Sequence, residues 1–186
     1  MYNELFRIKG MGNVMVDKRK IRLLQLVNGF SIGGAERKLL ELINMLDRDR
    51  YDITICSVGI SGPLKKEFEA TGYDVFLFTK KHKFDFTQVF KVAKLMKERD
   101  IDIVMTTLFY ADIIGALAAK LGGVRHVISW DTVSNPAESD EDKWRHRVAY
   151  RLCMSFVDKI VPVSDGVKQF LIKKRGINPK KIQTIH

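Results

Sequence analysis

The sequence predicts an α/β fold in which helices cover both faces of a parallel sheet. Short apolar segments of strand character alternate with amphipathic helical segments along almost the whole chain. Each crossover between two such strands places a helix over the sheet, so the sheet is expected to be buried on both faces. A glycine pair, Gly33 and Gly34, lies between the first strand and the first helix. We therefore expect a Rossmann-like domain.

The first half of the chain alternates regularly. Apolar residues dominate the strands expected at 21–28, 51–58 and 73–78, and the first strand leads through a short turn into a helix that begins at Ala35. The next helix, from 62 or 63 to 71, has Pro63 in its first turn and Gly72 after its end, the positions that these residues favour. The helix at 86–99 has one apolar stripe, formed by Phe86, Val89, Phe90, Ala93 and Met96.

The second half continues the alternation. We expect strands at 101–106, 124–130, 159–163 and 182–185. Gly122 and Gly123 end the helix at 109–121, and Ser139 opens the following helix with a capping hydroxyl and acidic residues in the first turn. Apolar residues of that helix recur at four-residue spacing, at Trp144, Val148, Leu152 and Phe156. Ser164 begins the last helix, at 164–175.

Length and composition indicate an ordinary globular domain. The 186 residues fit one domain or one half of a two-domain enzyme, and 46% apolar with 29% charged residues predicts a sizeable core. No apolar run approaches the ~20 residues of a membrane-spanning helix. Residues 1–20 lack the apolar stretch of a secretory signal, so we interpret them as a flexible leader or an expression remnant. Cys56 and Cys153 have no framework spacing, which favours reduced thiols in a cytoplasmic protein.

Positive charge is concentrated near the end of the chain. The net charge is +10, and residues 143–181 hold eleven Lys or Arg against two acids, an excess of nine. Such a region attracts anionic lipid headgroups, a substrate with a pyrophosphate group, or nucleic acid, although a solvated basic face is equally common. No helix-turn-helix, zinc spacing or aromatic-rich strand motif favours nucleic acid. The four histidines form no pair with metal-ligand spacing, so we expect no metal.

The turn from Gly29 to Gly34 is a candidate ligand site. Glycines let the backbone approach a ligand, and the N-terminus of the following helix favours a phosphate or another anion. The spacing matches neither a dinucleotide fingerprint nor a Walker loop, and a simple tight turn explains the glycines equally well. Because parallel sheets bind ligands at the carboxyl ends of their strands, the loops 106–112, 130–140 and 163–166 are further candidates.

Two acids and one serine lie in these loops. Asp112 and Asp131 have the chemistry to orient a sugar hydroxyl or to act as bases, but helix capping and loop solvation are the more frequent roles of such residues. Ser164, followed by Asp165, is first of all an N-cap, and a substrate contact is the second choice.

Three segments also match a known pattern. They are Ile21 to Glu36 with Gly33-Gly34-Ala35-Glu36, Asp102 to Asp112 with Leu108-Phe109-Tyr110-Ala111-Asp112, and Val161 to Val167 followed by Lys180-Lys181-Ile182. Together they resemble the N-terminal half of the family-four (group 1) retaining glycosyltransferases, and the order and spacing of the elements agree over 21–186. The resemblance implies one half of a GT-B fold, in which two Rossmann-like domains face each other across a cleft.

The resemblance also implies an activity. These enzymes move a sugar from a nucleotide diphosphate donor to a polysaccharide, lipid-linked or protein-linked acceptor, retain the anomeric configuration and need neither a metal nor a cofactor beyond the nucleotide sugar. The N-terminal half binds mainly the acceptor, so this chain, which lacks the second domain, is expected to be inactive alone. The implied location is the cytoplasm, at the inner face of the membrane, with the basic region toward an anionic surface.

Individual residues acquire roles through the same resemblance. Gly33 and Gly34 would approach the donor diphosphate or the acceptor, and Asp131 would be the catalytic residue that orients the attacking hydroxyl. The acceptor side would be lined by Thr107, Tyr110, Asp112 and Thr132, with Ser164 at the border of the cleft. The family often has His-x-His where Met105-Thr106-Thr107 stands, and many members have a histidine in place of Asp131, so no catalytic histidine is assigned.

Alternatives from other classes remain. One is a non-catalytic half-domain that binds a glycan or a partner chain. Another is a Rossmann-like nucleotide-binding epimerase or reductase, against which stand the missing Gly-x-Gly-x-x-Gly and Tyr-x-x-x-Lys patterns. The family pattern continues into a second domain at the point where this sequence reaches His186, which favours a cut at a domain boundary over a natural half.

Overall fold

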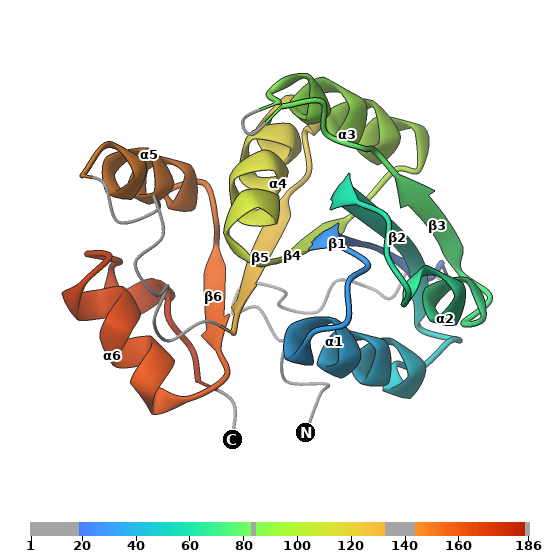
Figure 1. The fold of residues 1–186 in the computed structure, drawn as a ribbon, viewed down its shortest axis with the longest axis horizontal. Coiled ribbons are helices and arrows are strands. Elements are labelled where there is room, and N and C mark those ends of the chain that lie inside the picture. The colour runs from blue at the N-terminus through green and yellow to red at the C-terminus, as the bar shows by residue number, and fades with distance from the viewer. Residues whose placement is uncertain (1–18, 83–84, 133–143, 185–186) are drawn as a thin grey trace.

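One sheet of six parallel strands organises the chain (Figure 1). The computed structural model describes residues 19–82, 85–132 and 144–184, with the backbone alone for 144–147 and 149. The strands are β1 (Ile21–Gly29), β2 (Tyr51–Ile60), β3 (Asp74–Leu77), β4 (Ile103–Thr107), β5 (His126–Asp131) and β6 (Lys159–Pro162). The helices are α1 (Gly34–Met45), α2 (Lys65–Glu69), α3 (Thr87–Glu98), α4 (Phe109–Gly122), α5 (Trp144–Met154) and α6 (Asp165–Lys173), followed by the 3-10 turn η3 (Pro179–Lys181).

Helices lie on both faces of the sheet, which confirms the predicted fold class. Figure 1 shows α3 and α4 on one face, α1 and α2 on the other, and α5 and α6 near the β6 edge. Alternate residues of β1 point to opposite faces, so Leu24 packs in the core beneath α3 and α4, whereas Leu23 packs with Leu39 of α1 and Phe68 of α2. Burial of each such side chain stabilises the fold by roughly 1.5–3 kcal/mol.

The strand order places the ends of β1 and β4 side by side. The order is β3-β2-β1-β4-β5-β6, and Leu26 of β1 is in register with Cys56 of β2 on one side and with Thr106 of β4 on the other. The chain leaves β1 toward β2 and returns to the opposite side of β1 as β4. Strand order therefore reverses between β1 and β4, which is the point where open α/β sheets bind ligands.

Several predicted helix ends are confirmed. Gly123 follows α4 with a left-handed φ of 75°, which glycine adopts without the strain of a side chain. Ser164 is the N-cap of α6, and its hydroxyl accepts a hydrogen bond from the Val167 backbone N–H. The helix after β2 is shorter than predicted, because residues 63–64 form a turn. The predicted strand at 182–185 is wrong within the described residues: Ile182 makes only an isolated bridge to Ile160.

Both predicted apolar stripes are partly misplaced. On α3, Val89 and Met96 are buried as expected, but Phe86 and Phe90 are exposed, Phe90 by 69%. In the second stripe, Val148 and Leu152 of α5 and Phe156, two residues beyond its end, are exposed, Leu152 by 63%. The side chain of Trp144 lies outside the described residues.

Tertiary contacts explain the orientation of α5. Among its described side chains, those of Tyr150, Cys153 and Met154 are buried. The Tyr150 ring stacks on Phe109 of α4 with the ring centroids 5.0 Å apart. The helix is therefore oriented by these contacts and not by its four-residue apolar repeat.

Two sequence predictions concern residues that the structure does not describe. Residues 1–18 and the Ser139 cap lie outside the described residues. The two cysteines, Cys56 and Cys153, are buried and free.

Candidate active site

The candidate site lies at the carboxyl edge of the sheet, where the loops after β1, β4, β5 and β6 meet the first turns of their helices. The structure brings Gly34, Tyr110, Asp131, Thr132 and Ser164 to this edge, each directly after a strand or in the first turn of the helix that follows it. Residues 133–140 of the predicted third loop lie outside the described residues. The edge is therefore built from strands that are far apart in sequence.

The two glycines after β1 have different environments. Gly33 is the N-cap of α1, and a Cβ built on it would lie 2.2 Å from Oε2 of Glu36, which is buried and accepts a hydrogen bond from the Ser31 hydroxyl at 3.3 Å. A Cβ on Gly34, the first residue of α1, would meet no atom within 4 Å. A side chain at Gly33 would therefore displace the carboxylate end of Glu36, whereas the fold leaves space beside Gly34.

The entry into α4 is tied to β1. The side-chain oxygen of Asn28 accepts a hydrogen bond of 2.7 Å from the backbone N–H of Ala111. Leu108, the N-cap, has φ 75° and ψ 153°, a region that glycine adopts and other residues rarely do. Such strain is commonly found at functional sites, and here it sets the direction in which the chain enters the first turn of α4.

Thr107 lies beneath the edge and not on it. Its side chain is buried, and its hydroxyl oxygen accepts a hydrogen bond of 3.0 Å from the amide of Gln25, which is itself fully buried in β1. This placement favours a supporting role for Thr107 under the site over direct contact with a ligand.

Tyr110 is half-buried in the first turn of α4. Its hydroxyl donates a hydrogen bond of 3.2 Å to the backbone carbonyl of Asp85, just before α3. Burial raises the pKa of the phenol, opposed by the bond to Asp85, so the side chain is a neutral donor at neutral pH. Tyr110 therefore connects the loop before α3 to the candidate site.

Asp112 is the centre of a buried polar network. Its carboxylate accepts hydrogen bonds from the hydroxyls of Thr106 at 2.5 Å, Ser129 at 2.9 Å and Tyr150 at 3.4 Å. Burial raises its pKa from 3.8 to about 7, the negative charge of Asp131 adds to this, and the three hydrogen bonds oppose it. Because the side chain faces these partners inside the protein, it is placed to support the edge and not to touch an acceptor.

Asp131 is the last residue of β5, next to this network, and Thr132 follows it. Both are half-exposed, and the charge of Asp131 acts on Asp112 and on Tyr150. Ser164 follows β6 and is exposed, with its hydroxyl oxygen engaged as the cap of α6. The candidate site therefore has an accessible layer with Asp131, Thr132 and Tyr110, and a buried layer with Thr107 and Asp112.

Sequence reasoning missed the partners in the buried layer. Thr106 and Ser129 are polar residues inside apolar strands, and a hydroxyl at a buried strand position signals a hydrogen-bonding partner nearby. The guanidinium of Arg175, only 8% exposed, lies within 5.7 Å of the ring centroids of Phe109, Tyr150 and Phe170. No pattern in the sequence indicated that this arginine is buried among rings.

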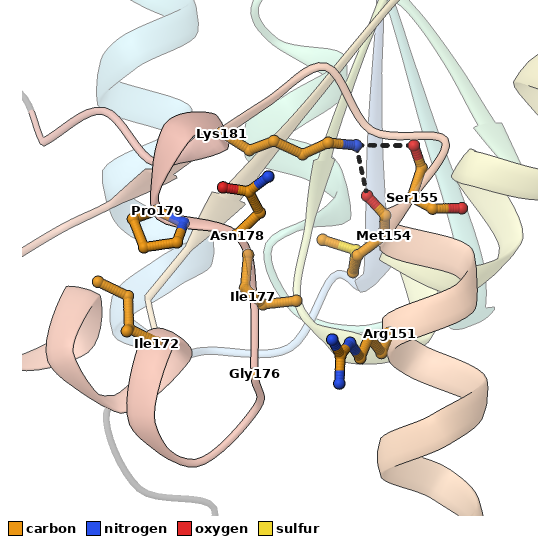
Figure 2. A pocket seen from close by; sticks show the side chains of 9 residues that line it. All are labelled: Arg151, Met154, Ser155, Ile172, Gly176, Ile177, Asn178, Pro179 and Lys181. Atoms are coloured by element: carbon orange, nitrogen blue, oxygen red, sulfur yellow. Dashed lines mark hydrogen bonds between the residues drawn. The ribbon is translucent and has the colours of Figure 1, made fainter.

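A separate hollow of about 610 Å³ lies at the other end of the molecule (Figure 2). It is bordered by the end of α5 and by η3, and Lys181 donates hydrogen bonds from its ammonium group to the carbonyls of Met154, Ser155 and Val157 at 3.2, 2.7 and 2.7 Å. These carbonyls belong to the last residue of α5 and to the segment that leads into β6, so the hollow lies at the amino end of β6, away from the candidate site. Lys181 stabilises the negative end of the α5 dipole there.

Two features are absent from the described part of the chain. No three His, Cys, Asp or Glu side chains in this part of the chain are arranged to hold a metal ion. None of its helices is long and apolar enough to cross a membrane.

Comparison with known proteins identifies relatives of defined activity. The chain is 27% identical over 171 residues to the capsular polysaccharide biosynthesis glycosyltransferase CapH of Staphylococcus aureus, covering 89% of this chain and 46% of CapH. It is 28% identical over 177 residues to the UDP-Gal:alpha-D-GlcNAc-diphosphoundecaprenol alpha-1,3-galactosyltransferase of Escherichia coli, covering 90% and 44%. The chain thus spans less than half the length of these curated relatives.

A solved structure shares the fold. HepE from Anabaena in complex with UDP superimposes with a TM-score of 0.71 at 19% identity, covering 89% of this chain and 43% of HepE. The family model of Glycosyltransferase Family 4 matches residues 32–186, from the loop before Gly33 onward. This match includes the ends of β4, β5 and β6 that build the candidate site. The chain therefore belongs to glycosyltransferase family 4.

Proposed function

We propose that residues 21–186 form the N-terminal, acceptor-binding domain of a retaining glycosyltransferase. The enzyme would transfer a sugar from a nucleotide diphosphate donor to a polysaccharide or lipid-linked acceptor. The observation that best supports this is the carboxyl edge of the sheet in a family 4 chain, where Gly34, Tyr110, Asp131 and Thr132 lie at or just after the ends of β1, β4 and β5. The relatives named above act in capsule synthesis and on a diphosphoundecaprenol-linked sugar.

The residues of the edge receive roles in this proposal. Asp131 orients the attacking acceptor hydroxyl, and Tyr110 and Thr132 contact the acceptor. Thr107 and Asp112 support them from below, and Ser164 borders the cleft. The open space beside Gly34 admits the donor diphosphate or the acceptor. Attack occurs on the face that the leaving phosphate departs from, so electrostatic stabilisation of that phosphate matters more than a strong base.

A transfer assay tests the proposal. The longer protein, with its nucleotide-binding half, is incubated with UDP-galactose or UDP-glucose and a short-chain lipid diphosphate that carries GlcNAc. We expect a glycosylated lipid and acceptor-dependent release of UDP, and no product from residues 1–186 alone. Epimerisation of the UDP-sugar without acceptor would instead indicate an epimerase, and glycan binding without transfer by the longer protein would indicate a binding module.

We further propose that the protein works in the cytoplasm at the inner face of the membrane. The basic region 143–181 supports this, although Arg175 is buried and Lys181 caps α5, so these two cations do not belong to an open basic surface. Binding to vesicles with phosphatidylglycerol, and not to neutral vesicles, is expected to weaken as salt is raised. Equal binding to both kinds of vesicle, or none, would contradict this location.

A further inference from the structure

The loop between β3 and α3 borders the candidate site. Its backbone follows the end of β2, since the N–H of Lys80 donates a hydrogen bond of 3.2 Å to the carbonyl of Gly59. Gln88 of α3 holds the same loop through a 3.0 Å hydrogen bond from its amide to the carbonyl of Thr79. Residues 79 and 80 of this loop are therefore held at the carboxyl edge.

Lys80 lies against the face of Tyr110. Its ammonium nitrogen is 5.1 Å from the centroid of the Tyr110 ring, within the range of a cation–π contact. The ring is itself held by the hydrogen bond from the Tyr110 hydroxyl to the carbonyl of Asp85. This contact restricts a flexible lysine and places a positive charge next to the first turn of α4, where the helix dipole also favours an anion.

The described lysines of this loop, Lys80 and Lys81, have no ion-pair partner in the described part of the chain, although Asp85 adds one negative charge to the same loop. Both lysines are exposed. The carboxylate of Asp85 is turned to other partners, accepting hydrogen bonds from the Thr87 hydroxyl, the Lys81 N–H and the Thr87 N–H. These bonds, the Thr87 hydroxyl first, lower the pKa of Asp85 to about 2.

We propose that Lys80, held on Tyr110, binds a phosphate group of a diphosphate-linked sugar acceptor. This inference rests on the proposed function. Tyr110 follows β4 and Asp131 ends the neighbouring strand β5, and adjacent strands lie ~4.8 Å apart. A single acceptor sugar could therefore have its hydroxyl at Asp131 while its diphosphate reaches Lys80. The donor also contains a diphosphate, so the experiment separates the two sources.

A binding measurement gives the first test. Residues 1–186 are titrated with a short-chain GlcNAc-diphospholipid, with inorganic pyrophosphate and with UDP. We expect Lys80→Ala to weaken binding of the GlcNAc-diphospholipid about five- to tenfold, the loss of one charge-assisted contact. Lys120→Ala is the matched control, because the Lys120 ammonium lies 5.9 Å from the Phe156 ring, in the last turn of α4 and away from the edge.

The outcomes are distinct. An unchanged affinity for the lipid in Lys80→Ala, or an equal loss in Lys80→Ala and Lys120→Ala, would overturn the inference, the latter because general charge would explain the effect. A loss for UDP but not for the GlcNAc-diphospholipid would assign the lysine to the donor and also overturn it. Thermal unfolding of each variant excludes a folding defect.

Kinetics of the longer enzyme separate this inference from the proposed function. With the diphosphate acceptor, Lys80→Ala should raise the KM for the acceptor about five- to tenfold and leave the KM for the UDP-sugar unchanged. With a GlcNAc alkyl glycoside, which has no phosphate, the variant should match the parent. If the parent transfers sugar and Lys80→Ala has an unchanged KM, this inference fails while the function stands. If the parent enzyme transfers no sugar, the proposed function is refuted, and the binding measurement alone then tests the role of Lys80.

Discussion

Ser129 donates a hydrogen bond of 2.9 Å from its hydroxyl to the buried carboxylate of Asp112, and so joins β5 to the first turn of α4. Thr106 and Tyr150 bind the same carboxylate from β4 and α5. One side chain thus fixes the relative positions of four elements beneath the edge that ends in Asp131. The protonation of this carboxylate should therefore affect the free energy of unfolding.

Stability should depend on pH through Asp112. Its pKa is about 7 in the folded protein against 3.8 ordinarily, so between about pH 4 and pH 7 the folded protein holds a proton that the unfolded chain has lost. Its contribution to the free energy of unfolding should fall as pH rises, by about 1.4 kcal/mol per pH unit within this window. Asp112→Asn, which cannot ionise, should flatten that slope in urea unfolding from pH 4.5 to 7.5. Parallel curves for variant and parent would show that Asp112 does not titrate in this range.

Asp131 is predicted to act in transfer. Asp131→Ala in the longer enzyme should lower turnover by well over tenfold, roughly 1.4 kcal/mol or more of transition-state stabilisation, with little change in the KM for the donor. The initial rate of UDP release at saturating acceptor measures this. Asp52→Ala, which removes an exposed carboxylate from β2, serves as the control and should match the parent. Activity near the parental level in Asp131→Ala would dismiss its catalytic role.

Substitution of Gly34 tests whether this glycine serves ligand binding or only folding. Because a Cβ there meets no atom within 4 Å, Gly34→Val should leave the melting temperature within about 2 °C of the parent yet abolish transfer by filling the space beside the first turn of α1. Gly62→Ala is the opposite case, since its Cβ would lie 2.2 Å from the Phe30 carbonyl oxygen and should destabilise the fold. If Gly34→Val transfers sugar at the normal rate, the glycine pair is only a turn.

Asn28 should stabilise the entry into α4. Asn28→Ala leaves the Ala111 N–H without its partner and should cost about 1–2 kcal/mol in the free energy of unfolding. Asn28→Asp keeps an acceptor oxygen at the positive end of the helix and should recover most of the loss. Chemical denaturation of both variants at pH 8 provides the comparison. Equal losses in the two variants would mean that the side-chain oxygen is not what stabilises the helix entry.

The sequence indicates the fold more fully than the site. Alternation of apolar strands and helices was sufficient for the sheet, and glycine and serine at helix ends located the caps at Gly123 and Ser164. The apolar repeat of α5 predicted the wrong buried side of the helix. Leu152 is exposed, because the contact of Tyr150 with Phe109 determines which side faces inward. The spacing of apolar residues predicts an apolar face of a helix, but not the element against which that face packs.

The site was predictable only to the level of its loops. The strand-end rule located Tyr110, Asp112 and Asp131 in one region, but it did not distinguish the exposed carboxylate from the buried one. That distinction depends on Thr106 and Ser129, which come close to Asp112 only in the folded sheet. No local sequence feature encodes such a three-way contact.

The adjacency of β1 and β4 also bears on how the protein folds. Asn28 and Ala111, whose hydrogen bond joins the two strand ends, are 83 positions apart, whereas β1, β2 and β3 can pair through much shorter loops. Closing the longer loop costs more chain entropy, and contacts of high sequence separation slow folding. A refolding intermediate with only the first three strands paired would lack the ends of β4, β5 and β6 that build the candidate site. The candidate site should therefore form in the last kinetic phase of refolding.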